Sequence, residues 1–347
     1  MVPSTGRRLP GIEGLRALAA TSVLAYHSWA NSSPSGRPVS LGPFNGYVSD
    51  LAFGVTLFFT LSGFLLYRPF ARSVLSGEPL PRIGGYLRNR ALRILPAYWV
   101  ILLIAAVGLQ TVLVRTGTHL RPHAMHGEKL IRTATFTQNY TPSTLGSGIG
   151  PAWSLAVEAV FYLVLPLLAL FAMLVAGRDA SVTRRWIAAL APPFALLAFG
   201  LSGKAAAAFL VPGPHNAWNN DWHSVIELSF WGQADLFAFG MGLAAVYSAV
   251  AAGGIALPRL WRPLAWLVVI GGYVLVRVAA HPDEQLSYSP SNTVMAVVCT
   301  ALLGLVVLQT AERRSQTLML RILELRPVIW VGVVSYSVFL WHGPIIR

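Results

Sequence analysis

This chain contains about nine runs of roughly 20 mostly apolar residues, the length that an α-helix needs to cross a membrane. Charged side chains make up only 11% of its 347 residues, whereas soluble domains carry about 25%. Runs this long and this poor in charge predict an all-α integral membrane protein. We expect spans near 13–30, 48–67, 93–114, 152–176, 186–203, 226–249, 263–280, 291–310 and 328–346.

The basic residues between these runs are unevenly distributed. With the N-terminus inside, the inner segments hold 17 arginines, and the outer segments hold 6 arginines and lysines, including Lys204 in a loop expected over 204–225. Because basic residues favour the cytoplasmic side, this imbalance predicts a cytoplasmic N-terminus. Arg16 and His27 interrupt the first run, so we interpret it as a retained span rather than a cleaved signal peptide.

The first run, GIEGLRALAATSVLAYH, carries ionisable residues that a lipid-facing helix avoids. Arg16 and His27 are eleven residues apart, so on a helix they share one face about 16 Å apart along the axis. A cation and a titratable imidazole on one face suggest the wall of an internal passage, because histidine can move a proton near neutral pH. Alternatively, His27 hydrogen-bonds a neighbouring helix and Arg16 extends toward the membrane surface.

The stretch YLRNRALRILPAYW places Arg88, Arg90 and Arg93 at the start of a span. Arg90 and Arg93 are three residues apart and share a helix face. Two guanidinium groups there could bind phosphate groups through paired hydrogen bonds. Arginines at the inner end of a span are also what membrane orientation requires, and the spacing alone favours this simpler explanation.

Two further stretches place polar or small residues inside apolar runs. Glu158, in PAWSLAVEAVFYLVLP, must pair with a cation or be protonated, and an arginine or His27 could be its partner. Ser62 and Gly63, in FFTLSGFLLYRPF, are small enough to allow close helix packing.

The later runs contain the candidates for substrate binding. Gln233 and Asp235 lie in FWGQADLFAFGMGL, and His342 lies in VSYSVFLWHGPI near the outer end of the last span. A histidine flanked by aromatic residues is more often an interface anchor than a catalyst. The candidate substrate-binding residues are Asp235, His342 and Trp153.

The outer loops expected over 115–151 and 204–225 carry further histidines and tryptophans. Three histidines lack a nearby carboxylate or cysteine, so no metal site is predicted; they are His119, His123 and His126. Three other residues could stack on a sugar or lie in the membrane interface; they are Trp218, Trp222 and His223. Phosphate-loop and nucleic-acid-binding motifs are absent from the sequence, so no nucleic-acid partner is expected.

Five stretches, taken together and in this order, resemble the acyltransferase-3 family of multi-pass membrane acyltransferases: GIEGLRALAATSVLAYH, FFTLSGFLLYR, RALRILPAYW, WSLAVEAVFYLVLP and SYSVFLWHGPI. The resemblance covers nearly the whole chain. It implies one membrane domain over 1–347 in the plasma (inner) membrane, built as a bundle of about nine to ten transmembrane helices with an internal cavity.

The resemblance also implies an activity. Family members transfer an acyl group, usually acetyl, from cytoplasmic acyl-CoA to a hydroxyl of an acceptor. Their acceptors are sugars of surface polysaccharides, peptidoglycan, glycolipids or small secondary metabolites. The implied partners are therefore membrane lipid, an acyl-CoA donor and a glycan or small hydroxylated acceptor, without a metal cofactor. The sequence does not specify an oligomeric state.

The family's functional residues have counterparts in this sequence. Its Arg-x10-His pair falls on Arg16 and His27, its Arg-x-x-Arg motif on Arg90 and Arg93, and the glutamate of its Trp-Ser-Leu segment on Glu158. We expect His27 to take the proton of the attacking alcohol or to position it, and Glu158 to hold the imidazole. Arg16 would stabilise the thioester oxyanion or bind CoA, while Arg90 and Arg93 would bind CoA phosphates.

The chain departs from the family pattern at several positions. Glu13 replaces a common aspartate, and Ala159 and Val160 replace a common glutamate and glutamine. Gln233 stands near the place of a common arginine. The sequence ends five residues after His342, where relatives usually continue, which leaves open whether the domain lacks a final span.

Other functions fit parts of the pattern. The same enzyme could transfer a longer group, such as succinyl or a fatty acyl chain. From a different class, a transporter or flippase also places buried charges along a passage, but it predicts broken helices in inverted halves, which the sequence does not show. A membrane scaffold leaves Arg16, His27 and Glu158 unexplained.

Overall fold

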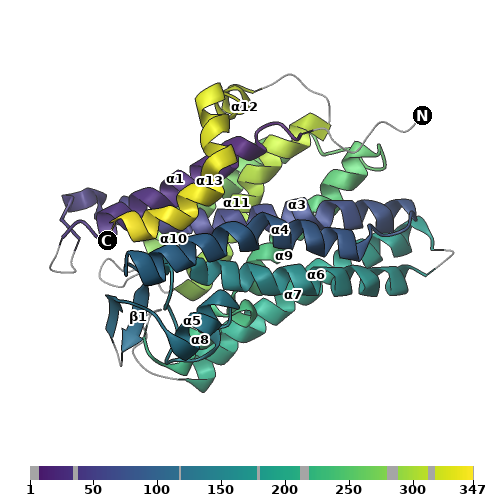
Figure 1. Ribbon diagram of the computed structural model, residues 1–347. Coiled ribbons are helices and arrows are strands. Elements are labelled where there is room, and N and C mark those ends of the chain that lie inside the picture. Colours follow the sequence, from purple (N-terminus) through teal and green to yellow (C-terminus); the bar gives the residue numbers. More distant parts are fainter. Residues whose placement is uncertain are drawn as a thin grey trace.

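The computed structural model describes residues 8–33, 38–116, 119–177, 180–211, 219–279, 288–311 and 317–346. Nine long helices form a bundle within these residues (Figure 1), and each corresponds to one of the predicted apolar runs. The all-α prediction is therefore confirmed. The long helices are α1 (Ile12–Ala30), α3 (Gly54–Ser76), α4 (Ile83–Leu103), α6 (Trp153–Ala176), α7 (Val182–Leu210), α9 (Phe230–Ala251), α10 (Trp261–Ala279), α11 (Tyr288–Ala311) and α13 (Arg326–Ile346).

Eight of these helices, within the described residues, are long and apolar enough to cross a membrane. The exception is α1, because Glu13, Arg16 and His27 reduce its apolar character. It packs along α13 and against α3, so protein surrounds much of this polar helix. The chain is thus a multi-pass membrane protein whose first helix is held by its neighbours.

Short elements connect the long helices. The segment between α4 and α6 contains strands β1 (Leu113–Thr116) and β2 (His119–Pro122), which pair antiparallel, and α5 (Gly127–Ala134). These elements lie together with α8 (Trp222–Leu228) at one end of the bundle (Figure 1). The other short pieces are α2 (Asn45–Ser49), α12 (Leu318–Leu323), a π-helical turn at Ile104–Gly108, and 3₁₀ turns at Gly42–Phe44, Asp50–Phe53, Gln138–Tyr140 and Gly150–Ala152.

Several helices extend beyond the predicted spans because their polar ends remain helical. The span predicted over 93–114 begins ten residues too late, since α4 starts at Ile83 and includes all three of its arginines. The predicted outer loop at 204–225 is wrong at its start, because α7 continues to Leu210. Lys204 is therefore a buried helical residue, 7% exposed, rather than a loop residue.

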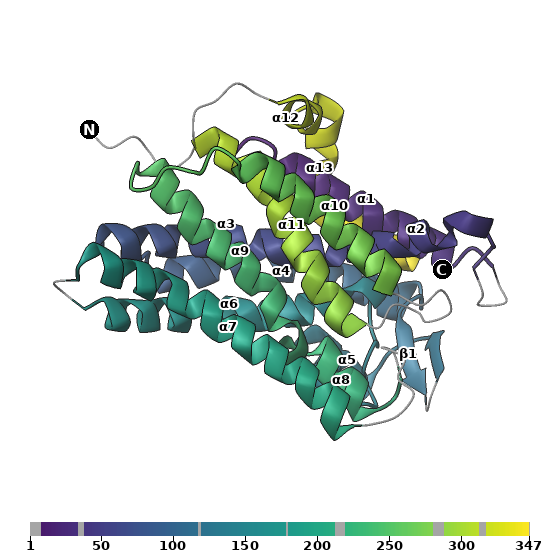
Figure 2. The ribbon, with the colours of Figure 1, turned by 180° about the vertical axis from the view of Figure 1, so that it is seen from behind.

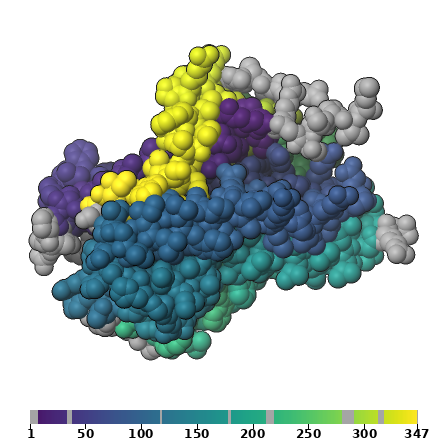
Figure 3. Space-filling model, in the orientation of Figure 1, coloured from purple at the N-terminus to yellow at the C-terminus, as the bar shows by residue number. Residues whose placement is uncertain are grey.

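Close helix contacts are made at glycines. A Cβ on Gly63 of α3 would overlap the Phe237 carbonyl of α9, and a Cβ on Gly240 of α9 would overlap the Thr60 carbonyl of α3. The close packing predicted at Gly63 is thus confirmed. Seen from behind, α10 and α11 lie on the face opposite α4 (Figure 2). On the front face, α4 runs across the surface with α13 beside it (Figure 3).

Candidate active site

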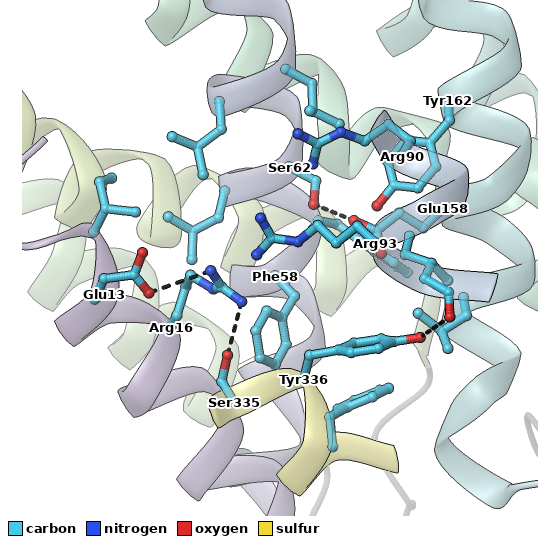
Figure 4. Close-up of a pocket in the computed structure, with 18 of the residues that line it drawn as sticks. Glu13, Arg16, Phe58, Ser62, Arg90, Arg93, Glu158, Tyr162, Ser335 and Tyr336 are labelled. Carbon is cyan, nitrogen blue, oxygen red and sulfur yellow. Dashed lines mark hydrogen bonds and ion pairs between the residues drawn. The ribbon is translucent and has the colours of Figure 1, made fainter. Parts of the chain in front are cut away.

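A cavity of about 420 Å³ lies among α1, α3, α4, α6 and α13 (Figure 4). Its described lining includes five arginines and two glutamates, a formal excess of three positive charges. These residues are Arg8, Arg16, Arg68, Arg90, Arg93, Glu13 and Glu158. A partly buried site with this charge excess is complementary to an anionic ligand.

Helix α4 supplies the central cations. Arg90 and Arg93 stand one turn apart, and Arg93 extends into the cavity toward Arg16 of α1 (Figure 4). Among the described residues, Arg93 forms no ion pair and the Nε of Arg90 has no hydrogen-bond partner. These guanidinium groups retain donors that a ligand's phosphate groups could use.

Arg16 is held by two neighbours. Its Nη1 lies 3.3 Å from Oε2 of Glu13, one turn earlier on α1, and its Nη2 donates to Oγ of Ser335 on α13 at 3.1 Å. These contacts aim the guanidinium into the cavity (Figure 4). Arg16 of α1 is thus one of the residues that line this cavity.

Glu158 of α6 lies across the cavity from Arg16. Ser62 of α3 donates a hydrogen bond to its carboxylate, and Tyr162, one turn later on α6, lies beside it (Figure 4). Ser62 therefore has a polar partner in the cavity in addition to its place beside Gly63. Within the described residues, the side chain that donates to this carboxylate thus carries a hydroxyl group rather than an imidazole.

His27 is absent from the described lining of this cavity and lies against α13 instead. Its ring centroid is 5.1 Å from that of His342. The Nδ1 of His27 is 2.9 Å from the Val23 carbonyl, and that of His342 is 3.1 Å from the Val338 carbonyl. Because a carbonyl oxygen only accepts, each Nδ1 carries a hydrogen, and the lone pair of a neutral ring is then on Nε2.

The predicted face of α1 is supported by these contacts. Arg16 touches Ser335 and His27 stacks beside His342, so both residues face α13. The structure separates them, however, because Arg16 lines the cavity and His27 lies beyond it. His342 also differs from a residue that anchors the protein at the membrane interface, because it is buried within the protein and only 4% exposed.

Asp235 and Trp153, predicted as substrate-binding residues, lie outside the cavity. Asp235 is fully buried, and its Oδ2 accepts from Nζ of Lys204 at 2.6 Å and from Oγ1 of Thr293 at 2.6 Å. This cluster joins α7, α9 and α11. Trp153 is buried with its ring 6.2 Å from that of Phe59, a cavity residue.

The loop residues have separate surroundings. Trp222 is 57% exposed, whereas His223 is buried with Nδ1 3.8 Å from Oε2 of Glu227. Trp218 lies outside the described residues. No three potential metal-ligating side chains gather anywhere in the part of the chain that the structure describes.

Several cavity residues were not singled out from the sequence. The stretch FFTLSGFLLYRPF contains Arg68 ten residues after Phe58, which is about 15 Å along one helix. The sequence alone does not show that the Arg68 side chain faces the cavity, because this depends on how α3 packs. Tyr162, four residues after Glu158, could have been found by helical spacing. The other missed polar residues are Arg8, Ser154, Ser335 and Tyr336.

Sequence comparisons identify relatives of this chain. The family model described as an acyltransferase domain matches residues 9–347. The peptidoglycan O-acetyltransferase OatA of Listeria monocytogenes is 25% identical over 97% of this chain and 49% of its own length. Nodulation protein 10 of Rhizobium leguminosarum is 30% identical over 54% of the chain and 48% of its own length, and acyltransferase MdmB of Streptomyces mycarofaciens is 29% identical over 46% and 39%.

The chain spans about half the length of the curated relatives OatA and YrhL, so the shared part need not carry the whole activity of either. No solved structure matches the chain. The family match covers all nine long helices and, apart from Arg8, every arginine, glutamate and histidine of the site. This protein therefore belongs to the acyltransferase-3 family of membrane acyltransferases.

Proposed function

We propose that this protein transfers an acyl group, in the first instance acetyl, from cytoplasmic acyl-CoA to a hydroxyl of a cell-surface glycan, a glycolipid or a small secondary metabolite. The observation that carries the proposal is the cavity with three excess positive charges, next to a pair of histidines. CoA is an anion with several phosphate groups, so its charge complements this cavity.

The donor occupies the cavity with its phosphates at the arginines. Arg90 and Arg93 retain free donors, and Arg8 and Arg68 add two cations at the ends of α1 and α3 that we place at the cytoplasmic face. From Arg68, the cavity follows α3 past Ser62 to Phe58, about 15 Å along the helix. The extended arm of CoA would lie along this path and carry the thioester toward the histidines.

The transfer needs a base and a bound donor. His27 takes the proton of the acceptor hydroxyl on Nε2 while the oxygen attacks the thioester carbon. The C–S bond then breaks, the ester forms, and CoA leaves as a thiol after receiving a proton. Arg16, which Glu13 and Ser335 hold in the donor cavity apart from His27, binds CoA.

Glu158 has a different part in this scheme from the one expected from the sequence. The Val23 carbonyl fixes the tautomer of His27, so a carboxylate is not needed for that purpose. We assign Glu158, with Ser62 and Tyr162, to the donor cavity, where its charge positions the neighbouring guanidinium groups.

The proposal is tested with membranes that contain the wild type or His27→Ala and receive radiolabelled acetyl-CoA. We expect label in cell-envelope glycans or small lipids to fall by about 10²–10⁴-fold in the variant, the range for loss of a general base. Acetyl-CoA binding to the purified variant should be unchanged. Unchanged acetylation would exclude His27 as the base, and a wild type that neither binds acyl-CoA nor transfers label would overturn the proposed function.

A further inference from the structure

Two phenylalanine rings lie at one end of the donor cavity. Phe58 of α3 and Phe339 of α13 both line it, and their rings meet edge to face with centroids 5.7 Å apart. Phe339 is only 6% exposed. This end is opposite to Arg68, which lies ten residues further along α3.

The histidine pair lies directly behind these rings. The ring of Phe339 is 5.9 Å from that of His342, and His342 is 5.1 Å from His27. Neither histidine belongs to the described lining of the cavity. The rings of Phe58, Phe339, His342 and His27 are therefore successive neighbours from the cavity to the base.

We propose that Phe339, together with Phe58, forms the end wall of the donor site and limits the length of the acyl group. This inference rests on the proposed function. If the phosphates of CoA lie at the arginines, the acyl group lies at the opposite end of the extended arm, beside these rings. An acetyl group needs little room there, whereas each added methylene requires space that closely packed rings do not offer.

The same arrangement makes Phe339 a specificity-determining residue. Its ring contacts Phe58 on the cavity side and His342 on the other side. A smaller side chain would open space between cavity and histidine pair without removing a charged or hydrogen-bonding group. Acyl-chain preference should then change while the phosphate contacts remain.

The test measures binding of acetyl-, butyryl- and hexanoyl-CoA to the purified protein in detergent, with binding of CoA itself as reference. We expect the wild type to bind acetyl-CoA at least about tenfold more tightly than hexanoyl-CoA, the lower end of discrimination by methylene groups in a pocket. Phe339→Ala should reduce this ratio to near one. Phe194→Ala is the matched control, because Phe194 is 64% exposed on α7, away from the cavity, and it should retain the wild-type ratio.

Phe339→Leu is a second variant that keeps the test valid if Phe339→Ala does not fold. It should give an intermediate ratio of acetyl-CoA to hexanoyl-CoA affinity. The inference is overturned if the wild type shows no preference, or if folded Phe339→Leu and Phe339→Ala keep the wild-type preference. Binding without length discrimination would overturn this inference alone. Failure of CoA and all three acyl-CoAs to bind would overturn the proposed donor site as well, so the two failures are distinguishable.

Discussion

His27 and His342 lie with their ring centroids 5.1 Å apart, on two helices more than 300 residues apart in the sequence. Each ring is fixed in the same way, by an Nδ1 contact to the carbonyl four residues earlier. In the neutral rings the lone pair is then on Nε2 of each histidine. We expect His342, as the aromatic neighbour of His27, to influence the protonation of that base.

His342→Phe tests whether the second histidine takes part in chemistry. Phenylalanine retains an aromatic ring beside Phe339 but removes both nitrogens. We expect transfer of labelled acetyl to fall at least about tenfold, less than the 10²–10⁴-fold effect of losing the base itself, while acetyl-CoA binding is retained. Full activity in His342→Phe would show that the ring only packs.

Substitution of either cavity arginine of α4 should weaken CoA binding, whereas substitution of a neighbouring arginine outside the cavity should not. Arg90 and Arg93 line the cavity, whereas Arg88 is exposed and does not. Arg90→Gln and Arg93→Gln should each weaken CoA binding by about 1.5–3 kcal/mol, the contribution of a hydrogen bond to a charged group. Arg88→Gln should bind CoA as the wild type does. Equal loss in all three variants would mean that these arginines act only through membrane orientation.

Glu158→Gln separates donor binding from catalysis. The amide is similar in shape and can accept from Ser62, but removal of the carboxylate raises the formal charge excess of the cavity from three to four. We expect CoA binding to be retained or tightened and acetyl transfer to decrease, measured by calorimetry and by label transfer. Weaker CoA binding in this variant would contradict the assigned position of Glu158 in the donor site.

Much of this fold was predictable because lipid imposes long apolar helices. All nine predicted runs are helices, and the shared face of Arg16 and His27 follows from helical spacing alone. The ends of α4 and α7 were not predictable from apolar character, since Arg90, Arg93 and Lys204 are polar residues that nevertheless continue these helices.

The site was harder to predict than the fold. Spacing cannot show that α13 lies along α1, and this contact brings Ser335 to Arg16 and His342 to His27. It also cannot show that Phe339 lines the cavity and contacts both Phe58 and His342. Asp235 was predicted to bind substrate, but its carboxylate is paired with Lys204 of α7. The sequence did not reveal this pair, because Lys204 was expected in a loop.

The buried pair of Lys204 and Asp235 should affect stability rather than donor binding. Asp235→Asn leaves the ammonium group buried without its counter-ion, which costs about 3–5 kcal/mol when a buried pair is broken. The double variant Lys204→Met/Asp235→Leu removes both charges and should recover part of the loss. Thermal unfolding in detergent measures this, and acetyl-CoA affinity of the folded variants should match the wild type. A stable Asp235→Asn with reduced acetyl-CoA affinity would restore the substrate-binding interpretation.

The proposed orientation can be tested with single cysteines. Glu78, between α3 and α4, and Glu128, in α5, are both exposed and lie at opposite ends of α4. The native Cys299 is buried and should give little background. If the arginine-rich end faces the cytoplasm, a membrane-impermeant maleimide should label Glu128→Cys in intact cells and Glu78→Cys only after permeabilisation. The opposite pattern would place the CoA phosphates outside the cell, where the proposed donor is absent, and would therefore rule out the cavity as a site for cytoplasmic acyl-CoA.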